Sequence, residues 1–362
     1  PPPKKMVTSG KEAVKLTVSG QVNRMVLFAD DGVEDEIFHV DNVNSGTRVR
    51  FVGKARLSPE WSSGIRVEFN LRENRSDKVC IQTGDRAKAE CDKGVAGADK
   101  DAAFDTSERF LEWTVTSKTL GKLYIGQGDT ASNSTNHVNF SGTLMPDFTG
   151  AQLVGGGIQF RDADTDETFG TDINDTFADF DGLSRRNRIR YDTPTFVGFK
   201  ASASHIQGDA WDVALRYAAK IPGFKLGAAI AFAEATNRFG FDQVNGSASI
   251  LHEPSGVSLT FAAGERDLET RGREDPLLRR VVVGYQFKAT PLGKTFLSAS
   301  FSRVDDFQKD GDESATWAVT VLQKIDKFSM ELYAGFRNWD LTRRGRDVED
   351  INLVFSGARI KF

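Results

Sequence analysis

"TRVRFVGKARL", residues 47–57, carries two kinds of side chain in alternation. One set, counted in twos, holds no charge: Val49, Phe51, Gly53, Ala55 and Leu57. The other set is almost entirely cationic: Arg48, Arg50, Val52, Lys54 and Arg56. Because successive side chains of a β-strand point to opposite faces, the stretch predicts a strand with one apolar face and one basic face.

The same period of two returns along the whole chain, for example in residues 14–28, 65–71, 111–116, 211–217, 281–287 and 328–336. Tight turns such as "IPG" and "EPSG" alternate with longer charged loops such as "DLETRGREDP". This order of short turns and long polar loops is typical of a transmembrane β-barrel. We therefore predict an all-β protein, a transmembrane antiparallel barrel of about sixteen strands with ~9–11 residues each.

The composition limits the other classes of protein. Only 39% of the 362 residues are hydrophobic, and the longest apolar run, residues 226–233, is far shorter than the ~20 residues of a membrane helix. The net charge of −4, from 47 basic and 51 acidic residues, gives no indication of a nucleic-acid partner. The chain thus predicts neither a helical membrane protein nor a nucleic-acid-binding protein.

A soluble β-sandwich would show the same alternation, so the covering of the apolar faces decides between the two folds. No segment with a sustained helical period is available to cover them, whereas lipid can do so, and closure of a barrel removes the sheet edges. Aromatic residues near the ends of the runs also match an interfacial girdle. These aromatic residues are Phe28, Phe69, Trp211, Phe287 and Trp339. The sequence therefore favours the barrel.

Three stretches carry a resemblance to a known family: residues 14–32, residues 185–204 ("RRNRIRYDTPTFVGFKASAS") and the C-terminal "LVFSGARIKF" ending in Phe362. In this order and spacing the chain resembles the Gram-negative outer-membrane general porin superfamily, in particular the alphaproteobacterial-type trimeric porins. Residues 1–12 then form an N-terminal extension and residues 13–362 a single barrel domain. The resemblance implies a long third loop folded into the barrel, the constriction loop, at approximately residues 128–184.

This third loop is longer than the family's pattern leads us to expect. Its "LMPDFTG", residues 144–150, is only loosely similar to the family's constriction motif. The extra length leaves three alternatives open: a short helix, part of a strand around residues 157–161, or a more complete plug.

The resemblance also implies what the protein does. We expect a water-filled channel in the bacterial outer membrane for passive diffusion of small hydrophilic solutes and ions, and no enzyme. Expected partners are outer-membrane lipid, lipopolysaccharide and two further copies in a homotrimer, and Phe362 is expected to act as the C-terminal assembly signal. The alternative of the same fold is a substrate-specific channel, an anion-selective one among them.

Charged residues suggest the lining of the pore. Since an Arg facing the bilayer midplane costs about 2–4 kcal/mol, the basic face of each strand should face the lumen. The expected basic lining is Arg48, Arg50, Lys54, Arg56, Arg66, Arg186, Arg188 and Arg190. The expected acids of the constriction loop are Asp162, Asp164, Asp166, Asp172, Asp175 and Asp179. Folded inward, the loop would set these acids against the basic wall; otherwise the acids lie in a solvated loop and the arginines pair with them only structurally.

Few features suggest other chemistry. Cys80 and Cys91 suit a disulfide in an oxidising compartment, against the alternative of two unconnected thiols. No Ser-based or zinc-binding constellation is found, so we predict no catalytic residues, no metal site and no cofactor. A structural calcium ion at "DADTD", residues 162–166, stays open, although the Gly and the closing Glu of a hand-type loop are missing. An outer-membrane barrel enzyme and a soluble carbohydrate-binding protein are the remaining alternatives.

Overall fold

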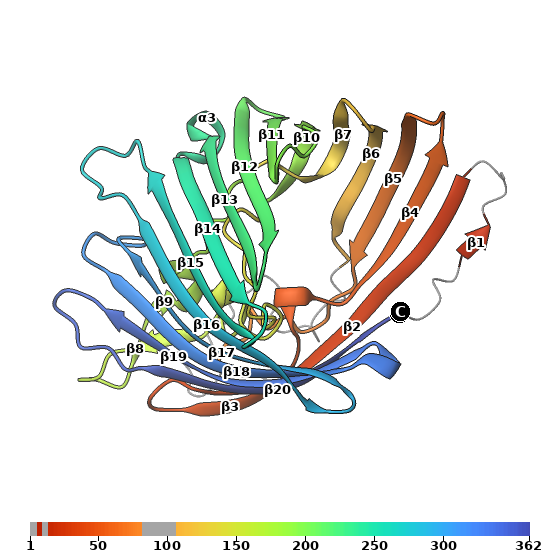
Figure 1. Ribbon diagram of the computed structural model, residues 1–362. Coiled ribbons are helices and arrows are strands. Elements are labelled where there is room, and N and C mark those ends of the chain that lie inside the picture. Colours follow the sequence, from red (N-terminus) through yellow and green to blue (C-terminus); the bar gives the residue numbers. More distant parts are fainter. Residues whose placement is uncertain (1–5, 9–13, 82–105) are drawn as a thin grey trace.

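One antiparallel sheet of 18 strands, closed on itself, forms the computed structural model, which describes residues 6–8, 14–81 and 106–362 (Figure 1). Two of these strands, β1 (Met6–Thr8) and β3 (Asp35–Asp41), pair only with β2 and are not part of the barrel wall. The remaining sixteen make the barrel wall, which confirms the prediction of about sixteen strands. In chain order they are β2 (Val14–Asp30), β4 (Arg48–Arg56), β5 (Trp61–Asn70), β6 (Glu108–Ser117), β7 (Gly121–Asp129), β10 (Arg185–Asp192), β11 (Phe199–Ile206), β12 (Ala210–Ile221), β13 (Phe224–Glu234), β14 (Asp242–His252), β15 (Val257–Asp267), β16 (Leu277–Thr290), β17 (Gly293–Asp305), β18 (Glu313–Ile325), β19 (Met330–Thr342) and β20 (Ile351–Lys361).

The barrel closes between its first and last long strands. β2 pairs with β20 from Gln21 opposite Lys361 to Asp30 opposite Asn352. One edge of β2 pairs with β20 and, beyond the end of β20, with β1. The other edge of β2 pairs with β4 and, beyond the end of β4, with β3. Phe362 and Gly20 exchange two backbone hydrogen bonds at this seam. A Cβ at residue 20 would lie 2.5 Å from Cζ of Phe362 and 2.7 Å from the backbone oxygen of Arg48, and the fixed backbone oxygen leaves room only for a glycine.

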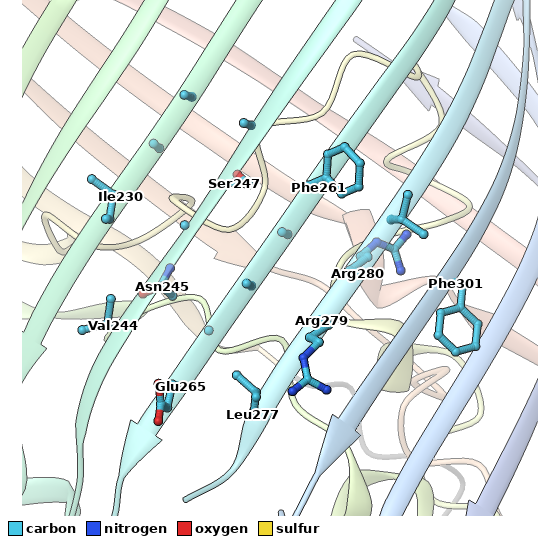
Figure 2. A pocket seen from close by; sticks show the side chains of 18 residues that line it. Ile230, Val244, Asn245, Ser247, Phe261, Glu265, Leu277, Arg279, Arg280 and Phe301 are labelled. Atoms are coloured by element: carbon cyan, nitrogen blue, oxygen red, sulfur yellow. The ribbon is translucent and has the colours of Figure 1, made fainter.

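The outer face of the wall is apolar, as the alternation predicts. Ile230 and Phe261, for example, are each 56% exposed. Figure 2 shows this part of the sheet, where small residues leave a shallow hollow between larger apolar side chains. Arg279 and Arg280, next to each other on β16, illustrate the two faces. Arg279 pairs with Asp305 and stays largely exposed, whereas Arg280 is buried inside the barrel.

In the described part of the chain, the connections hold several short helices and one short hairpin. They are η1 (Val43–Ser45), η2 (Ala151–Leu153), α2 (Ile173–Thr176), α3 (Thr236–Phe239), η3 (Asp326–Phe328) and the hairpin of β8 (Gln159–Arg161) with β9 (Thr168–Asp172). None of the helices in the described part of the chain is both long and apolar enough to span a bilayer.

The connection between β7 and β10, residues 130–184 and hereafter loop 3, runs through the inside of the barrel (Figure 1). It holds η2, α2 and the β8–β9 hairpin, so both a short helix and a strand near residues 157–161 occur in it. The end of the barrel where loop 3 begins is called the loop end below, and the opposite end the turn end.

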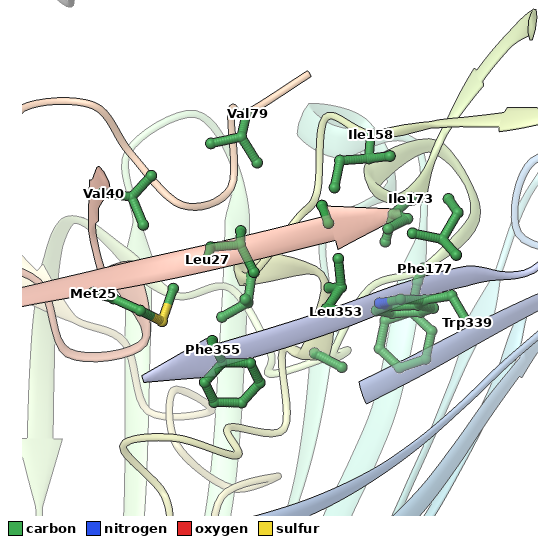
Figure 3. Close-up of a cluster of buried hydrophobic side chains, with 14 of the residues drawn as sticks. Met25, Leu27, Val40, Val79, Ile158, Ile173, Phe177, Trp339, Leu353 and Phe355 are labelled. Atoms are coloured by element: carbon green, nitrogen blue, oxygen red, sulfur yellow. The ribbon is translucent and has the colours of Figure 1, made fainter. Parts of the chain in front are cut away.

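An apolar core lies inside the barrel, between loop 3 and one side of the wall (Figure 3). Leu27 of β2 and Leu353 of β20 are fully buried against Ile158 of loop 3 and its neighbours. Trp339 is also fully buried and meets the Phe177 ring edge-on, with centroids 5.0 Å apart. The expectation that Trp339 belongs to an outer girdle is therefore wrong, because loop 3 supplies an apolar partner for the inner face.

Candidate channel lumen

The inner face of β4 and β5 carries a cluster of arginines around one carboxylate. Glu68 of β5 is fully buried in this cluster and pairs with Arg50, with Arg66 at 3.0 Å and with Arg48 at 3.7 Å. Arg48 and Arg50 stand opposite Gln21 and Ser19 of β2, so they share the inner face with them. Glu68 follows the same alternation as Arg66 but was not among the predicted lining residues.

A β-bulge brings a fourth arginine to the same carboxylate. The pairing of β5 with β6 shifts register between Glu68 and Phe69, which leaves Arg109 as an extra residue. Nε of Arg109 lies 2.7 Å from Oε1 of Glu68. Counted in twos, Arg109 belongs with the outward Leu111, and a bulge re-aims the side chain. A period-two analysis cannot find such a residue.

Arg188 and Arg190 of β10 share the inner face but are buried rather than open to the lumen. Arg188 lies 2.5 Å from Glu112 and donates to the carbonyls of Gly126 and Asp129. Arg190 pairs with Asp192 at 2.7 Å and donates to the Thr130 carbonyl. The expectation that these two arginines present free charge to the pore therefore needs correction, since their donors are used to hold the beginning of loop 3.

The other expected basic residues lie at different heights of the barrel. Arg186 is half-buried near the loop end, with its guanidinium 4.6 Å from the centre of the Phe239 ring. Lys54 stands opposite Lys15 and is exposed. Arg56 is exposed and donates to the Ser58 carbonyl in the turn that follows β4. Only some of the predicted basic residues thus lie together, and these surround Glu68.

The inner faces of β11, β14, β15, β17 and β18 are different in character, because small hydroxyl residues are frequent on them. We call this surface the hydroxyl wall: Ser202, Ser204, Ser247, Ser249, Ser258, Thr260, Ser298, Ser300, Ser302, Ser314, Thr316 and Thr320, all buried. The hydroxyls bond loop 3 directly. The Val138 and Phe140 amides donate to Ser247 and Ser249 at 2.9 and 3.0 Å, and Ser247 donates to the Thr135 carbonyl at 2.7 Å. Loop 3 therefore lies along this wall.

A buried ionic cluster fixes the middle of loop 3. Oδ1 of Asp147 accepts from Arg280 and Arg337, each at 2.8 Å, and from the Ser300 hydroxyl at 3.1 Å. Asp147 is fully buried, and both arginines are nearly so. Asp147 is the acid of "LMPDFTG", the stretch that resembles a constriction motif. A buried pair of this kind is costly to break, because an unpaired charge would remain.

The predicted acids of loop 3 have partners other than the arginines around Glu68. Asp162 lies 2.6 Å from Arg346, which belongs to the connection that follows β19. The backbone amide of Asp162 donates to the Glu167 carbonyl in the turn of the β8–β9 hairpin. Asp164 and Asp166 belong to the same turn. Asp172 and Asp175 form a capping box at the start of α2, where burial and the Asp175 charge raise the pKa of Asp172 to about 6. The structure thus places these acids along loop 3 rather than in one cluster.

His137 lies between two carboxylates of loop 3. Its ring nitrogens are 3.3 Å from Asp179 and 3.4 Å from Asp181, and its ring packs on Phe148. Burial disfavours the imidazolium, but Asp181 and Asp179 outweigh it and raise the pKa of His137. Asp179, the last of the predicted acids, is therefore an internal partner of the loop.

Two further predictions concern a disulfide and a possible calcium site. Cys80 is disulfide-bonded, and Cys91, the expected partner, lies outside the described residues. Within residues 6–8, 14–81 and 106–362, no group of three or more His, Cys, Asp or Glu side chains is arranged to hold a metal ion. At residues 162–166, the stretch considered for calcium, the Asp162 carboxylate binds Arg346.

A closed sixteen-stranded barrel with an apolar outer face and a long loop inside defines an outer-membrane channel protein. The sequence model of the Gram-negative porins matches residues 6–343, so this chain belongs to the Gram-negative porin family. It is a bacterial outer-membrane protein, and its channel serves passive diffusion. The predictions of family, localisation and channel function are thus confirmed.

Comparison with solved structures gives the same fold at low sequence identity. OmpT, an outer membrane protein of Vibrio cholerae, is 13% identical with a TM-score of 0.60, covering 99% of this chain and 100% of that chain. The anion-selective porin from Comamonas acidovorans is 13% identical with a TM-score of 0.60, covering 96% and 100%. OmpF of Salmonella typhi is 13% identical with a TM-score of 0.56, covering 97% and 98%. A search of curated protein sequences found no match.

Proposed function

We propose that this porin prefers anions. The observation that carries the proposal is the cluster in which four arginines, Arg48, Arg50, Arg66 and Arg109, surround the single carboxylate of Glu68. One negative charge cannot neutralise four positive ones, so this side of the lumen keeps an excess of positive charge. Water in the lumen screens it only in part, and fixed charge of one sign raises the local concentration of the opposite ion.

The position of loop 3 supports this assignment. Its backbone lies on the hydroxyl wall and its apolar side chains fill the inner face near β2 and β20. The free part of the lumen therefore borders the arginines around Glu68 (hereafter the arginine wall), and solutes pass along that side. Transport of this kind needs no catalytic group and no cofactor, and we propose neither for this chain.

We further propose that the protein works as a homotrimer in contact with outer-membrane lipid and lipopolysaccharide. Membership in the porin family supports this, as does a trimer form of OmpT from Vibrio cholerae with the same fold. Conductance steps that arrive in groups of three, together with a cross-linked trimer on a gel, are the expected observations. Single, independent steps and a monomer after cross-linking would contradict it.

The reversal potential across a KCl gradient in a planar bilayer tests the anion preference. At about 0.1 M salt, where charges act over about 10 Å, we expect the sign of an anion-selective channel. The double variant Arg50→Gln/Arg66→Gln should shift the potential toward cation selectivity. Arg279→Gln, on the outer face of β16, is the control and should leave it unchanged. A cation-selective wild type, or a double variant equal to wild type, would refute the proposal.

A further inference from the structure

A second set of arginines lies at the loop end of the lumen, and its partners are aromatic rings instead of carboxylates. We call it the Arg–Phe ladder: Arg186, Phe239, Phe241, Arg266, Phe180 and Phe307. Its members come from β10, the β13–β14 connection, β15, loop 3 and the β17–β18 connection. All except Phe180 are only partly buried.

Each arginine of the ladder lies close to at least one phenylalanine ring. The Arg186 guanidinium lies 4.6 Å from the centre of the Phe239 ring, and the rings of Phe239 and Phe241 are 6.4 Å apart. The Arg266 guanidinium follows, 4.4 Å from Phe241, 4.5 Å from Phe180 and 5.7 Å from Phe307. Arg238 adds a further guanidinium 5.3 Å from Phe239.

These arginines face the inside of the barrel. Arg266 stands opposite Gln243, whose amide donates to the Phe180 carbonyl of loop 3 at 2.8 Å. Nε of Arg266 in turn donates to the Gln243 side chain at 2.8 Å. Arg186 stands opposite Gly128, on the same face of β10 as Arg188. A solute that enters from the loop end therefore meets the ladder.

The ladder differs from the arginine wall in its lack of paired carboxylates. Among the ion pairs of the described residues, none includes Arg186, Arg238 or Arg266. Nε of Arg186 is buried and has no hydrogen-bond partner in the described part of the protein. Asp179 and Asp181, the carboxylates on either side of Phe180, are turned to His137. Nε of Arg266 is taken by Gln243, but the terminal Nη groups of Arg186 and Arg266 make no hydrogen bond within the described residues, so these donors are left for a solute.

We propose that the Arg–Phe ladder binds anions that carry a planar aromatic group, such as aromatic monocarboxylates, as they enter the channel. A guanidinium offers parallel donors to a carboxylate, and the neighbouring phenylalanine offers a face or an edge to the ring of the solute. A small inorganic anion would use only the arginines. This inference rests on the proposed anion-preferring channel and names the class of solute that binds at its loop end.

The test uses purified, bilayer-reconstituted protein in about 0.1 M KCl, with three probes: benzoate, acetate and benzyl alcohol. Benzoate carries both charge and ring, acetate only the charge, and benzyl alcohol only the ring. We expect benzoate to reduce the chloride current at a concentration about tenfold lower than acetate, since ring stacking adds to charge pairing. Benzyl alcohol should have no effect in this range.

Two variants assign the effect to the ladder. Arg266→Gln should weaken the block by both benzoate and acetate, whereas Phe241→Leu should weaken only the block by benzoate and bring it close to that of acetate. Arg279→Gln, on the outer face beside the same region, should behave as wild type. Heat-modifiable migration on a gel shows which variants have folded, and the comparison of probes on the wild type decides even if Arg266→Gln does not fold.

Each result has a distinct meaning. Equal block by benzoate and acetate in the wild type would overturn the inference while the anion preference stands. An unchanged benzoate block in Phe241→Leu would show that the phenylalanines only support the arginines, which also overturns it. A folded protein that shows no anion preference in a KCl gradient would instead refute the proposed function itself.

Discussion

The two halves of the inner wall obey the same alternation but differ in what they contact. On β4 and β5, long cationic side chains point inward and no part of loop 3 is bonded to them in the described residues. On β14, serine hydroxyls point inward and accept from the loop backbone, and on β17 they bond the Thr143 and Asp147 side chains of the loop. Small hydroxyl side chains leave room for a chain segment and provide both donors and acceptors for it. The size of the inward residue thus decides whether the wall is bare or covered.

The half of the barrel that loop 3 covers has a packed apolar interior, like that of a soluble protein. Behind loop 3 the inner face has a packed core, with Leu27, Leu353 and Trp339 fully buried. On the arginine wall the inner face carries four arginines around one central carboxylate. Loop 3 and the hydroxyl wall determine the shape of the lumen, and the arginine wall determines its charge.

The largest effect is expected when loop 3 is released from the hydroxyl wall. Asp147→Ala would leave Arg280 and Arg337 buried without their carboxylate, which costs about 3–5 kcal/mol. We expect a lower free energy of unfolding in a urea titration in lipid vesicles, and larger, noisier conductance steps.

Asp305→Ala is the matched control for Asp147→Ala, because Asp305 also joins two arginines, Arg279 and Arg303, but does so on the outer face. An exposed pair contributes about 0–1 kcal/mol, so stability and conductance should change little. Equal losses in the two variants would mean that the buried cluster does not hold loop 3.

A smaller effect is expected from the apolar core of the covered wall. Leu353→Ala removes a fully buried side chain and should cost about 3 kcal/mol of the free energy of unfolding. Its neighbour Val354 points outward and is 50% exposed, so Val354→Ala should cost about 1 kcal/mol or less. Urea titration of both variants measures the difference, and a larger loss for Val354→Ala would contradict the assignment of the two faces.

The hydroxyl wall makes a weaker contribution at each position. In Ser247→Ala the Val138 amide and the Thr135 carbonyl lose their partner, which should cost about 1–2 kcal/mol. Ser356, an exposed residue of β20, supplies the control variant Ser356→Ala, for which we expect no measurable change in the urea midpoint. If Ser247→Ala also left the midpoint unchanged, the hydroxyl wall would not be a fixing surface for loop 3.

The barrel could be predicted from the sequence because lipid imposes one requirement on every strand, an apolar outer face. The inner face has no such common requirement, which is why its details were missed. Arg109 follows the outward alternation and turns inward only at a bulge. Trp339 resembles a girdle residue until loop 3 supplies Phe177 as its partner.

The path of loop 3 had a signal in the sequence that the charged residues obscured. "ASASHI", "GSASI" and "SASFS", residues 201–206, 246–250 and 298–302, place two or three serines at successive inward positions of three strands. Such a row of small hydroxyls is a poor lining for a wide pore and a suitable surface for a backbone. The partner of each inward charge, by contrast, depends on contacts far apart in the chain, as between Asp147 and Arg337.

Protonation of His137 should give the smallest effect and would show how far the inside of loop 3 depends on its own charges. Because Asp181 and Asp179 raise the pKa of His137, the ion pairs stabilise the fold fully below the ordinary value of 6.5 and are lost as the pH rises through the raised pKa. The temperature of heat-induced unfolding on a gel should therefore be higher for wild type than for His137→Gln in acid, and the difference should shrink in alkaline buffer. His252→Gln, at the end of β14 where Ser255 is the ring's only hydrogen-bond partner in the described residues, is the control and should not reproduce the behaviour of His137→Gln. A gap between wild type and His137→Gln that stays constant with pH would mean that the ring acts by packing on Phe148 and not by its charge.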